Sequence, residues 1–143
     1  MGFSVPAGIG AKFGRPDREV WIVVGDGCVQ MTIQELATIA QENLPVKIAL
    51  LNNNYLGMVR QWQQLFFDNN YSEVHLKNPN FVKLCEGFGI EAAKVTNREE
   101  ITKAITKARQ FDGPYFIEFV CEKEENVFPM IATGASVSEI RLE

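Results

Sequence analysis

Two short polar segments carry the residue types best suited to chemistry, and each follows an apolar run. Gly25-Asp26-Gly27 comes directly after residues 20–24, and Asn52-Asn53-Asn54 comes directly after residues 46–51. Short apolar runs that end in turn-forming residues are typical of buried parallel strands. Ligands of open parallel sheets bind outside the carboxyl ends of the strands, so we expect the two segments to share one site.

The residue types of these segments predict a metal-bridged diphosphate. Asp26 and Asn53, which lie 27 positions apart, offer a carboxylate and an amide oxygen, the hard ligands that Mg²⁺ prefers. A single carboxylate provides too little negative charge to bind the ion unless phosphate oxygens also coordinate it. Gly25 and Gly27 allow tight turns that aim backbone N–H groups at an anion. Each segment alone is typical of a turn or loop, but the pair after two strands is more specific.

The elements that must position these residues alternate between strands and helices. Residues 20–54 predict a β-α-β unit with a right-handed crossover, and its first strand is expected to be buried on both faces. Thr32-Ile33-Gln34-Glu35 has the form of a capping box, so a helix is expected to begin at Thr32 and to end before Pro45.

The rest of the chain continues the same alternation. A polar, turn-rich loop is expected over residues 68–79. Two helices are expected over residues 4–14 and 55–66. A third helix is expected to run from Asn78-Pro79 to Gly87 or Gly89, and a fourth to follow a cap at Asn97. Strands are expected over residues 92–95 and 115–120. This pattern predicts an α/β fold, a doubly wound and mostly parallel sheet with helices on both faces, in one domain over residues 1–143.

Composition and charge exclude several classes of protein. The 143 residues are 46% hydrophobic, which suffices for a core without metal or disulfide staples. The formal net charge is −4 and no Lys/Arg cluster is present, so no nucleic acid partner is expected. There is neither a long apolar run nor a signal sequence, so we expect a cytoplasmic protein with no membrane partner. The acidic run 118–125 is expected to be a solvated edge.

The cysteines and the histidine do not indicate a catalytic device of their own. Cys28, Cys85 and Cys121 lie far apart, with no C-x-x-C pair, which fits a reducing compartment. Cys85 lies on the apolar side of its predicted helix and is expected in the core. His75, the only histidine, lies in a polar stretch, so hydrolysis by a Ser-His-Asp or Cys-His device is not expected.

The two polar segments also resemble a known signature. Gly-Asp-Gly followed after about 25 residues by Asn-Asn resembles the motif with which thiamine-diphosphate-dependent enzymes hold Mg²⁺ and the cofactor's diphosphate. Across essentially its whole length the chain is similar to the C-terminal thiamine-diphosphate-binding domain of the acetolactate synthase (acetohydroxyacid synthase) catalytic subunits. The segments that carry this likeness are 1–3, 6–11, 30–36, 53–59, 61–63, 129–131 and Gly134.

The resemblance implies specific roles for the site residues. Asp26, the Asn53 side chain and the Tyr55 carbonyl would be the metal ligands. Met58 would support the bent cofactor from below its thiazolium ring and line the substrate site together with Trp62, which corresponds to the family's tryptophan that favours the larger 2-ketoacid. The other implied cofactor contacts are Met1 near the aminopyrimidine, Gly25, and the amides of Gly27, Cys28, Leu56 and Gly57.

The resemblance also implies a reaction and partners. The family decarboxylates pyruvate and condenses the product with pyruvate or 2-ketobutyrate, in branched-chain amino acid biosynthesis. No catalytic residue is expected in this chain, because the family's activating glutamate comes from a pyrimidine-binding domain of the same or a neighbouring subunit. FAD, where used, would bind outside this segment. A homodimer or tetramer is expected, and a regulatory subunit stays open. Without the pyrimidine-binding domain the chain alone is expected to have little or no activity, and upstream strands of its sheet are also expected to be missing.

Three other functions remain as alternatives. One is another thiamine-diphosphate-dependent decarboxylase, oxidase or carboligase, against which residues 61–63 and 129–130 argue. Another is a nucleotide-binding module, since residues 8–14 superficially resemble a dinucleotide fingerprint, although the spacing is wrong and no strand precedes it. The last is an inactive fragment that acts as a binding module.

Overall fold

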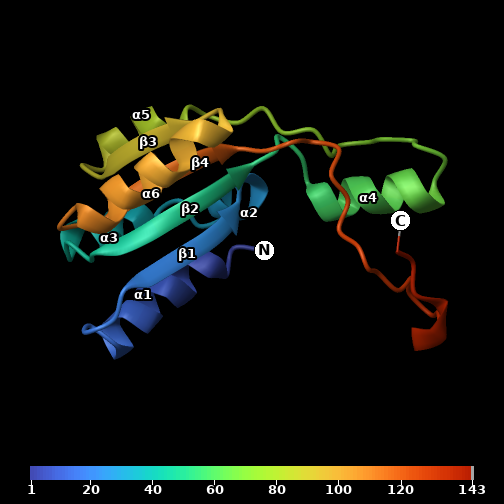
Figure 1. The fold of residues 1–143 in the computed structure, drawn as a ribbon, viewed down its shortest axis with the longest axis horizontal. Helices are drawn as coiled ribbons and strands as arrows, with labels where there is room; N and C mark the ends of the chain where they lie inside the picture. The colour runs from blue at the N-terminus through green and yellow to red at the C-terminus, as the bar shows by residue number, and fades with distance from the viewer. Residues whose placement is uncertain (143) are drawn as a thin grey trace.

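A four-stranded, fully parallel sheet forms the centre of the computed structural model, which describes residues 1–142 (Figure 1). Its strands are β1 (Val20–Gly25), β2 (Val46–Asn52), β3 (Glu91–Val95) and β4 (Tyr115–Val120), in the order β1-β2-β4-β3. Helices cover both faces, so the predicted α/β class and the parallel sheet are confirmed.

The helices divide into two layers and one outlying element. Four helices pack on one face of the sheet, namely α1 (Ser4–Gly14), α2 (Asp26–Gln30), α3 (Glu35–Gln41) and α5 (Phe81–Gly87). The other face carries α6 (Ile101–Gln110), which follows the 3-10 turn η1 (Arg98–Glu100). Figure 1 shows α4 (Gly57–Phe66) beyond the carboxyl ends of the strands, next to the C-terminal segment with η2 (Val137–Glu139). Among residues 1–142 no helix has the length and apolar character needed to cross a membrane.

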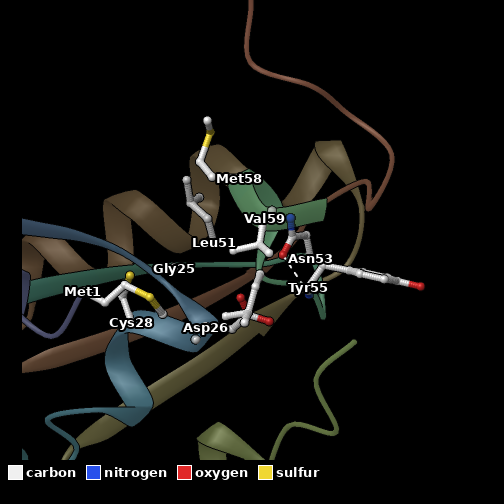
Figure 2. Close-up of a pocket in the computed structure, with 12 residues that line it drawn as sticks. Met1, Gly25, Asp26, Cys28, Leu51, Asn53, Tyr55, Met58 and Val59 are labelled. Carbon is white, nitrogen blue, oxygen red and sulfur yellow. Dashed lines mark hydrogen bonds between the residues drawn. The ribbon is translucent and has the colours of Figure 1, made fainter. Parts of the chain in front are cut away.

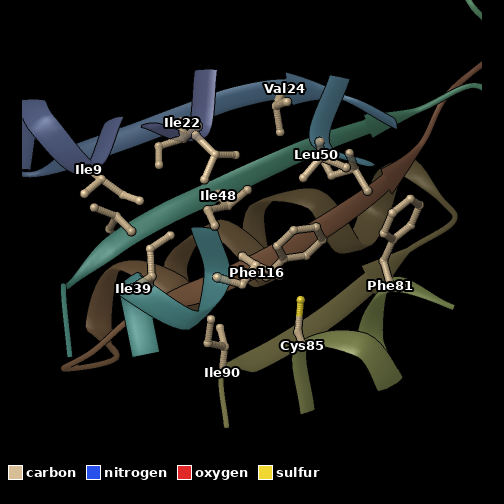
Figure 3. Packing of buried hydrophobic residues seen from close by; sticks show 14 of the residues in the cluster. Ile9, Ile22, Val24, Ile39, Ile48, Leu50, Phe81, Cys85, Ile90 and Phe116 are labelled. Atoms are coloured by element: carbon tan, nitrogen blue, oxygen red, sulfur yellow. The ribbon is translucent and has the colours of Figure 1, made fainter. Parts of the chain in front are cut away.

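The larger apolar core lies between the sheet and the four-helix layer (Figure 3). Successive strand residues point to opposite faces, so Ile22 and Ile48 enter this core while their neighbours face away. Helix α1 lies close to β1, because a Cβ on Gly8 would come within 2.3 Å of the Ile22 side chain. Cys85 is buried in this core as predicted, and burial raises the pKa of its thiol to about 12.

A smaller core lies under α6. Ile101, Ala104, Ile105 and Ala108 recur at helical spacing and pack against β3 and β4. Tyr115 is fully buried there, and its hydroxyl has no hydrogen-bond partner among the described residues. A buried polar group without a partner costs stability, so this hydroxyl weakens the fold.

The sequence prediction that the first strand is covered on both faces is wrong. Ile22 and Val24 are buried, but Val23 between them is 62% exposed. Helix α6 packs over β4 and β3, and no described helix covers β1 on that side. The face of β1 that carries Val23 is therefore only partly covered by residues 1–142, since Trp21 on the same face packs against the smaller core while Val23 does not.

Three predicted helix starts also need correction. Helix α3 begins at Glu35 rather than at Thr32: the residues between them form turns, the Glu35 amide bonds to the Thr32 carbonyl, and the Thr32 hydroxyl caps no amide of residues 1–142. Helix α5 begins after Asn80, whose side chain accepts from the Lys83 amide at 3.0 Å. Helix α4 begins at Gly57, because Tyr55 forms a β-bridge with His75.

The predicted cap at Asn97 and the predicted loop over residues 68–79 agree with the structure. The Asn97 side chain accepts a hydrogen bond from the Glu100 amide at 3.2 Å and opens η1, which leads directly into α6. Residues 68–79 contain turns and an isolated bridge but no helix or strand.

The unpartnered hydroxyl of Tyr115 gives a test of this packing. Tyr115→Phe removes only the buried oxygen, so we expect the free energy of unfolding to rise by about 1 kcal/mol. Urea unfolding followed by circular dichroism measures the change. Tyr71→Phe is the control, since that hydroxyl is exposed and donates to Asn69. A less stable Tyr115→Phe variant would show that the hydroxyl has a stabilising partner.

Candidate functional site

A cavity of about 260 Å³ opens at the carboxyl ends of β1 and β2 (Figure 2). All ten residues that the resemblance implies as cofactor contacts line it. They are Met1, Gly25, Asp26, Gly27, Cys28, Asn53, Tyr55, Leu56, Gly57 and Met58. Leu51 and Val59 also line the cavity, although the sequence did not single them out. The structure thus brings together residues that are up to 57 positions apart in the chain.

Parallel pairing of β1 with β2 explains why Asp26 and Asn53 meet. Gly25 lies opposite Leu51 in the register, so both strands end at the same level. Asp26 is the next residue after β1 and opens α2, while Asn52 ends β2 and leads into Asn53. Asp26 is only 2% exposed, and Figure 2 shows its side chain and that of Asn53 in the same part of the cavity.

The segment after β2 is shaped by its own side chains. Asn52 Oδ1 accepts from the Asn54 amide and Asn53 Oδ1 accepts from the Tyr55 amide, each at 3.1 Å. Asn54 has a φ of +59°, a conformation that asparagine tolerates better than most residues. These bonds turn the chain from β2 toward α4 and explain the run of three asparagines at this point.

Tyr55 contributes to the cavity through its backbone. Figure 2 shows its ring turned away from Asp26 and Met1. The ring packs edge-on against His75 at 5.2 Å, and the Arg60 guanidinium lies 5.5 Å from its centre. The backbone of Tyr55 is therefore the part that is left to face a ligand.

Two glycines allow the segments on either side of the cavity to lie close together. A Cβ on Gly27 would come within 2.7 Å of Leu56 Cδ2, and a Cβ on Gly57 would come within 3.3 Å of Asn53 Nδ2. Helix α2 and the start of α4 can approach each other because both positions lack a side chain. The backbone amides near Gly27 and Gly57 can therefore lie close to a bound anion.

Asn78 reaches this site from the loop before α5, and sequence reasoning missed it. Its Nδ2 carries two hydrogens and donates to Asp26 Oδ2 at 2.7 Å and to Asn52 Oδ1 at 2.8 Å, while Asn54 Oδ1 lies at the longer distance of 3.2 Å. Its Oδ1 accepts from Gln30 Nε2 at 2.8 Å. The local pattern of Asn78-Pro79 indicates only a helix start, because the partners lie at least 24 positions away.

Glu118 corrects the prediction of a solvated acidic edge. It is 2% exposed, pairs with Lys94 Nζ at 2.8 Å and accepts from Asn52 Nδ2 at 2.7 Å. The other acidic residues of that run, from Glu122 onward, are exposed as predicted. Glu118 differs because it lies within β4, on the face where its neighbours are buried. The sequence did contain a signal for this, because Glu118 lies inside the apolar run that predicts a strand over residues 115–120. Grouping it with the charged residues that follow hid that signal.

Trp62 lies outside the cavity. It belongs to neither apolar core, is half-buried on α4, and packs on Phe66 with ring centres 4.7 Å apart. The glutamines on either side hold the helix. Gln61 exchanges two hydrogen bonds with the backbone of Val127, at 3.0 and 2.7 Å, and Gln63 does the same with Ser72, at 3.0 and 3.1 Å. Trp62 therefore does not anchor α4 to either apolar core of residues 1–142.

The charges at the site fit a cation that binds together with an anionic ligand. Asp26 forms no ion pair with any residue from 1 to 142, and that part of the chain contains no cluster of three His, Cys, Asp or Glu residues able to hold a metal. Burial and, after it, the charge of Asp26 raise the pKa of the Cys121 thiol. One carboxylate, neutral oxygens and free amides fit a divalent ion that is shared with a diphosphate.

Comparison with known families agrees with this geometry. The family model described as "Thiamine pyrophosphate enzyme, C-terminal TPP binding domain" matches residues 1–119. The chain therefore belongs to this family, which is the class that the parallel sheet and the cavity at its carboxyl edge define. Thiamine pyrophosphate is the same compound as thiamine diphosphate.

Within that class the chain is similar to acetolactate synthases. It is 52% identical to the acetolactate synthase large subunit of Corynebacterium glutamicum, over 99% of this chain and 24% of the relative. It is 45% identical to the acetolactate synthase isozyme 2 large subunit of Escherichia coli K12, over 98% of this chain and 26% of the relative. The chain thus spans about a quarter of the length of these relatives.

A solved structure shares the fold. The thiamine diphosphate-dependent 4-hydroxybenzoylformate decarboxylase of Rhodococcus jostii RHA1 superposes with a TM-score of 0.82 and 32% identity. The match covers 88% of this chain and 24% of the decarboxylase. The fold prediction is therefore confirmed by a thiamine-diphosphate-dependent enzyme as well as by the sheet itself.

The ion pair between the buried Glu118 and the exposed Lys94 gives a test of how the site is supported. Glu118→Ala leaves Asn52 Nδ2 and Lys94 without their acceptor, so we expect a loss of about 2 kcal/mol in the free energy of unfolding. Urea unfolding measures it, with the exposed Glu122→Ala as control, expected within about 0.5 kcal/mol of the parent. Equal stability of the two variants would contradict a supporting role.

Proposed function

We propose that this chain is the cofactor-binding domain of an acetolactate synthase, which holds thiamine diphosphate through Mg²⁺. The observation that carries the proposal is the shared cavity of Asp26 and Asn53 at the ends of two neighbouring strands. Membership of the thiamine pyrophosphate family and the 45–52% identity to acetolactate synthase large subunits support it.

In this proposal the metal ligands are the Asp26 carboxylate, the Asn53 side-chain oxygen and the Tyr55 carbonyl. The backbone amides of Gly27, Cys28 and Gly57 contact the diphosphate, where missing side chains let the two segments approach. The Leu56 amide, which the sequence also suggested as a contact, already donates to Val74 O at 2.9 Å and is not free for the ligand. Cys28 contributes its amide and not its thiol. This donor set supplies a single negative charge, so it binds Mg²⁺ well only together with the diphosphate.

The apolar lining serves the organic part of the cofactor. When bound, thiamine diphosphate supplies the carbanion chemistry that decarboxylates one 2-ketoacid and joins the product to another. Met58 lies half-exposed at the cavity and supports the thiazolium, while Met1 lies near the aminopyrimidine. Leu51 and Val59 add apolar surface that excludes water from the reacting centre.

The complete enzyme requires more than this chain. We propose that a pyrimidine-binding domain of the same or a neighbouring subunit supplies the activating glutamate, that the assembly is a homodimer or tetramer, and that FAD, where used, binds to another domain. Pyruvate and 2-ketobutyrate are the proposed substrates, and a cytoplasmic location remains the expectation from sequence. A regulatory subunit is compatible with this arrangement.

A second candidate is another thiamine-diphosphate-dependent decarboxylase. The structural likeness to the Rhodococcus jostii 4-hydroxybenzoylformate decarboxylase favours it, although at 32% identity that likeness is lower than the likeness to acetolactate synthases. Product analysis separates the two, because a decarboxylase releases an aldehyde whereas an acetolactate synthase releases a branched hydroxy-ketoacid.

The first test removes the proposed metal ligand. In the complete polypeptide that contains this chain, Asp26→Ala should weaken thiamine diphosphate binding in the presence of Mg²⁺ by more than about 100-fold, because the only carboxylate at the site is lost. Isothermal titration calorimetry measures binding, and a colorimetric assay measures acetolactate formed from pyruvate. Asp17→Ala, on the exposed turn after α1, is the control. Unchanged binding by Asp26→Ala would refute the proposed site.

The second test concerns the acceptor. Trp62→Leu should lower the preference for 2-ketobutyrate over pyruvate by about tenfold, because apolar contact with the larger acceptor is reduced. Competition between the two acceptors, with both products quantified by chromatography, gives the ratio. Phe67→Leu is the matched control, because Phe67 follows the same helix and is 61% exposed. A ratio that does not move would remove Trp62 from the substrate site.

A further inference from the structure

A chain of hydrogen bonds runs from the interior of the sheet to the cavity. Glu118 on β4 accepts from Asn52 Nδ2 at 2.7 Å, and Asn52 Oδ1 accepts from Asn78 Nδ2 at 2.8 Å. Asn78 Nδ2 also donates to Asp26 Oδ2 at 2.7 Å. Two amides are therefore connected in series between two buried carboxylates.

The two carboxylates determine which way each amide points. An ionised carboxylate only accepts hydrogen bonds, so Asn52 must turn its NH₂ group toward Glu118 and its oxygen toward Asn78. Asn78 must turn its NH₂ group toward Asp26, and its oxygen then accepts from Gln30. Each side chain in the series has one orientation that satisfies its neighbours.

The charges at the two ends of the series differ. Glu118 is paired with Lys94 at 2.8 Å, so its charge is balanced. Asp26 has only the neutral Asn78 amide as a hydrogen-bond partner among residues 1–142, and its Oδ1 accepts none. A neutral donor orients a carboxylate without cancelling its charge, whereas a lysine or arginine in the same place would compete with a metal ion.

We propose that Asn78 is a positioning residue for the metal ligand Asp26. Its amide holds Oδ2 and leaves Oδ1 and the full negative charge to a divalent cation. Through Asn52, the same amide ties Asp26 at the end of β1 to the end of β2, which leads into the second proposed ligand, Asn53. This inference rests on the proposed binding of Mg²⁺ and a diphosphate.

The experiment measures binding rather than turnover. The complete polypeptide is freed of cofactor, and Mg²⁺ is titrated at a fixed concentration of thiamine diphosphate, with calorimetry as the readout. For Asn78→Ala we expect the Mg²⁺ concentration at half-saturation to rise about tenfold or more, and binding to recover at high Mg²⁺. Asn78→Ser, which keeps one O–H donor for Asp26, should fall between Asn78→Ala and the parent. It also serves as the second variant should Asn78→Ala fail to fold.

The control separates positioning from a general effect on the loop. Asn70→Ala changes the same residue type in the same loop, where the side chain is exposed and makes no hydrogen bond with the described residues, so the Mg²⁺ titration should not move. Melting temperatures without cofactor are compared in parallel. A lower melting temperature of Asn78→Ala with an unchanged Mg²⁺ requirement would make Asn78 merely structural and overturn the inference. Parent-like behaviour in both measurements would overturn it too.

The two proposals fail in different ways. If the parent polypeptide binds thiamine diphosphate equally well with and without Mg²⁺, or not at all, the proposed function itself fails. If the parent requires Mg²⁺ and Asn78→Ala requires no more of it, only the role of Asn78 fails.

Discussion

The parallel register of β1 and β2 is the constraint on which the site depends. Because Gly25 lies opposite Leu51, the residues that follow each strand emerge at one level of one edge. That alignment brings the close approach at Gly27 and the turn that the asparagine side chains form at Asn53 to the same cavity. A shift of one residue in this pairing would separate the carboxylate from the amide and reverse the faces of the strand.

At this edge Asp26 must be both buried and free to use its negative charge, and neutral amide groups make the two compatible. A carboxylate as buried as Asp26 requires hydrogen-bond donors, but a charged donor would remove the property that makes it useful. Asn78 satisfies one oxygen while remaining neutral. Glu118, which has no proposed contact with a ligand, is instead neutralised by Lys94. The charge of Asp26 therefore stays available to a cation, whereas the charge of Glu118 is neutralised within the protein.

The sequence was sufficient to predict the helices and strands and the contacts between residues that are near each other in the chain. Apolar runs located all four strands, and the spacing of Asp26 and Asn53 predicted that both lie at one edge. It was insufficient where partners come from distant segments. Asn78 and Glu118 look like a helix start and part of a charged edge until the fold brings them to Asn52. The capping motif at Thr32 misled because residues 31–34 form turns before α3 begins, and the Thr32 hydroxyl stays without a partner among residues 1–142.

Helix α4 is held differently from the rest of the molecule. It contributes no residue to either apolar core of residues 1–142, and side-chain hydrogen bonds from Gln61 and Gln63 join it to two irregular segments. The Gln63 tether is exposed to water, whereas Gln61 is fully buried. Because α4 contributes to neither core, we expect it to open at a lower free energy than the sheet, so that its amide hydrogens exchange with deuterium before those of β2. The proposed metal ligands Asp26 and Asn53 are placed by the ends of two paired strands, whereas Gly57, Met58 and Trp62 lie on a helix whose position does not depend on either core.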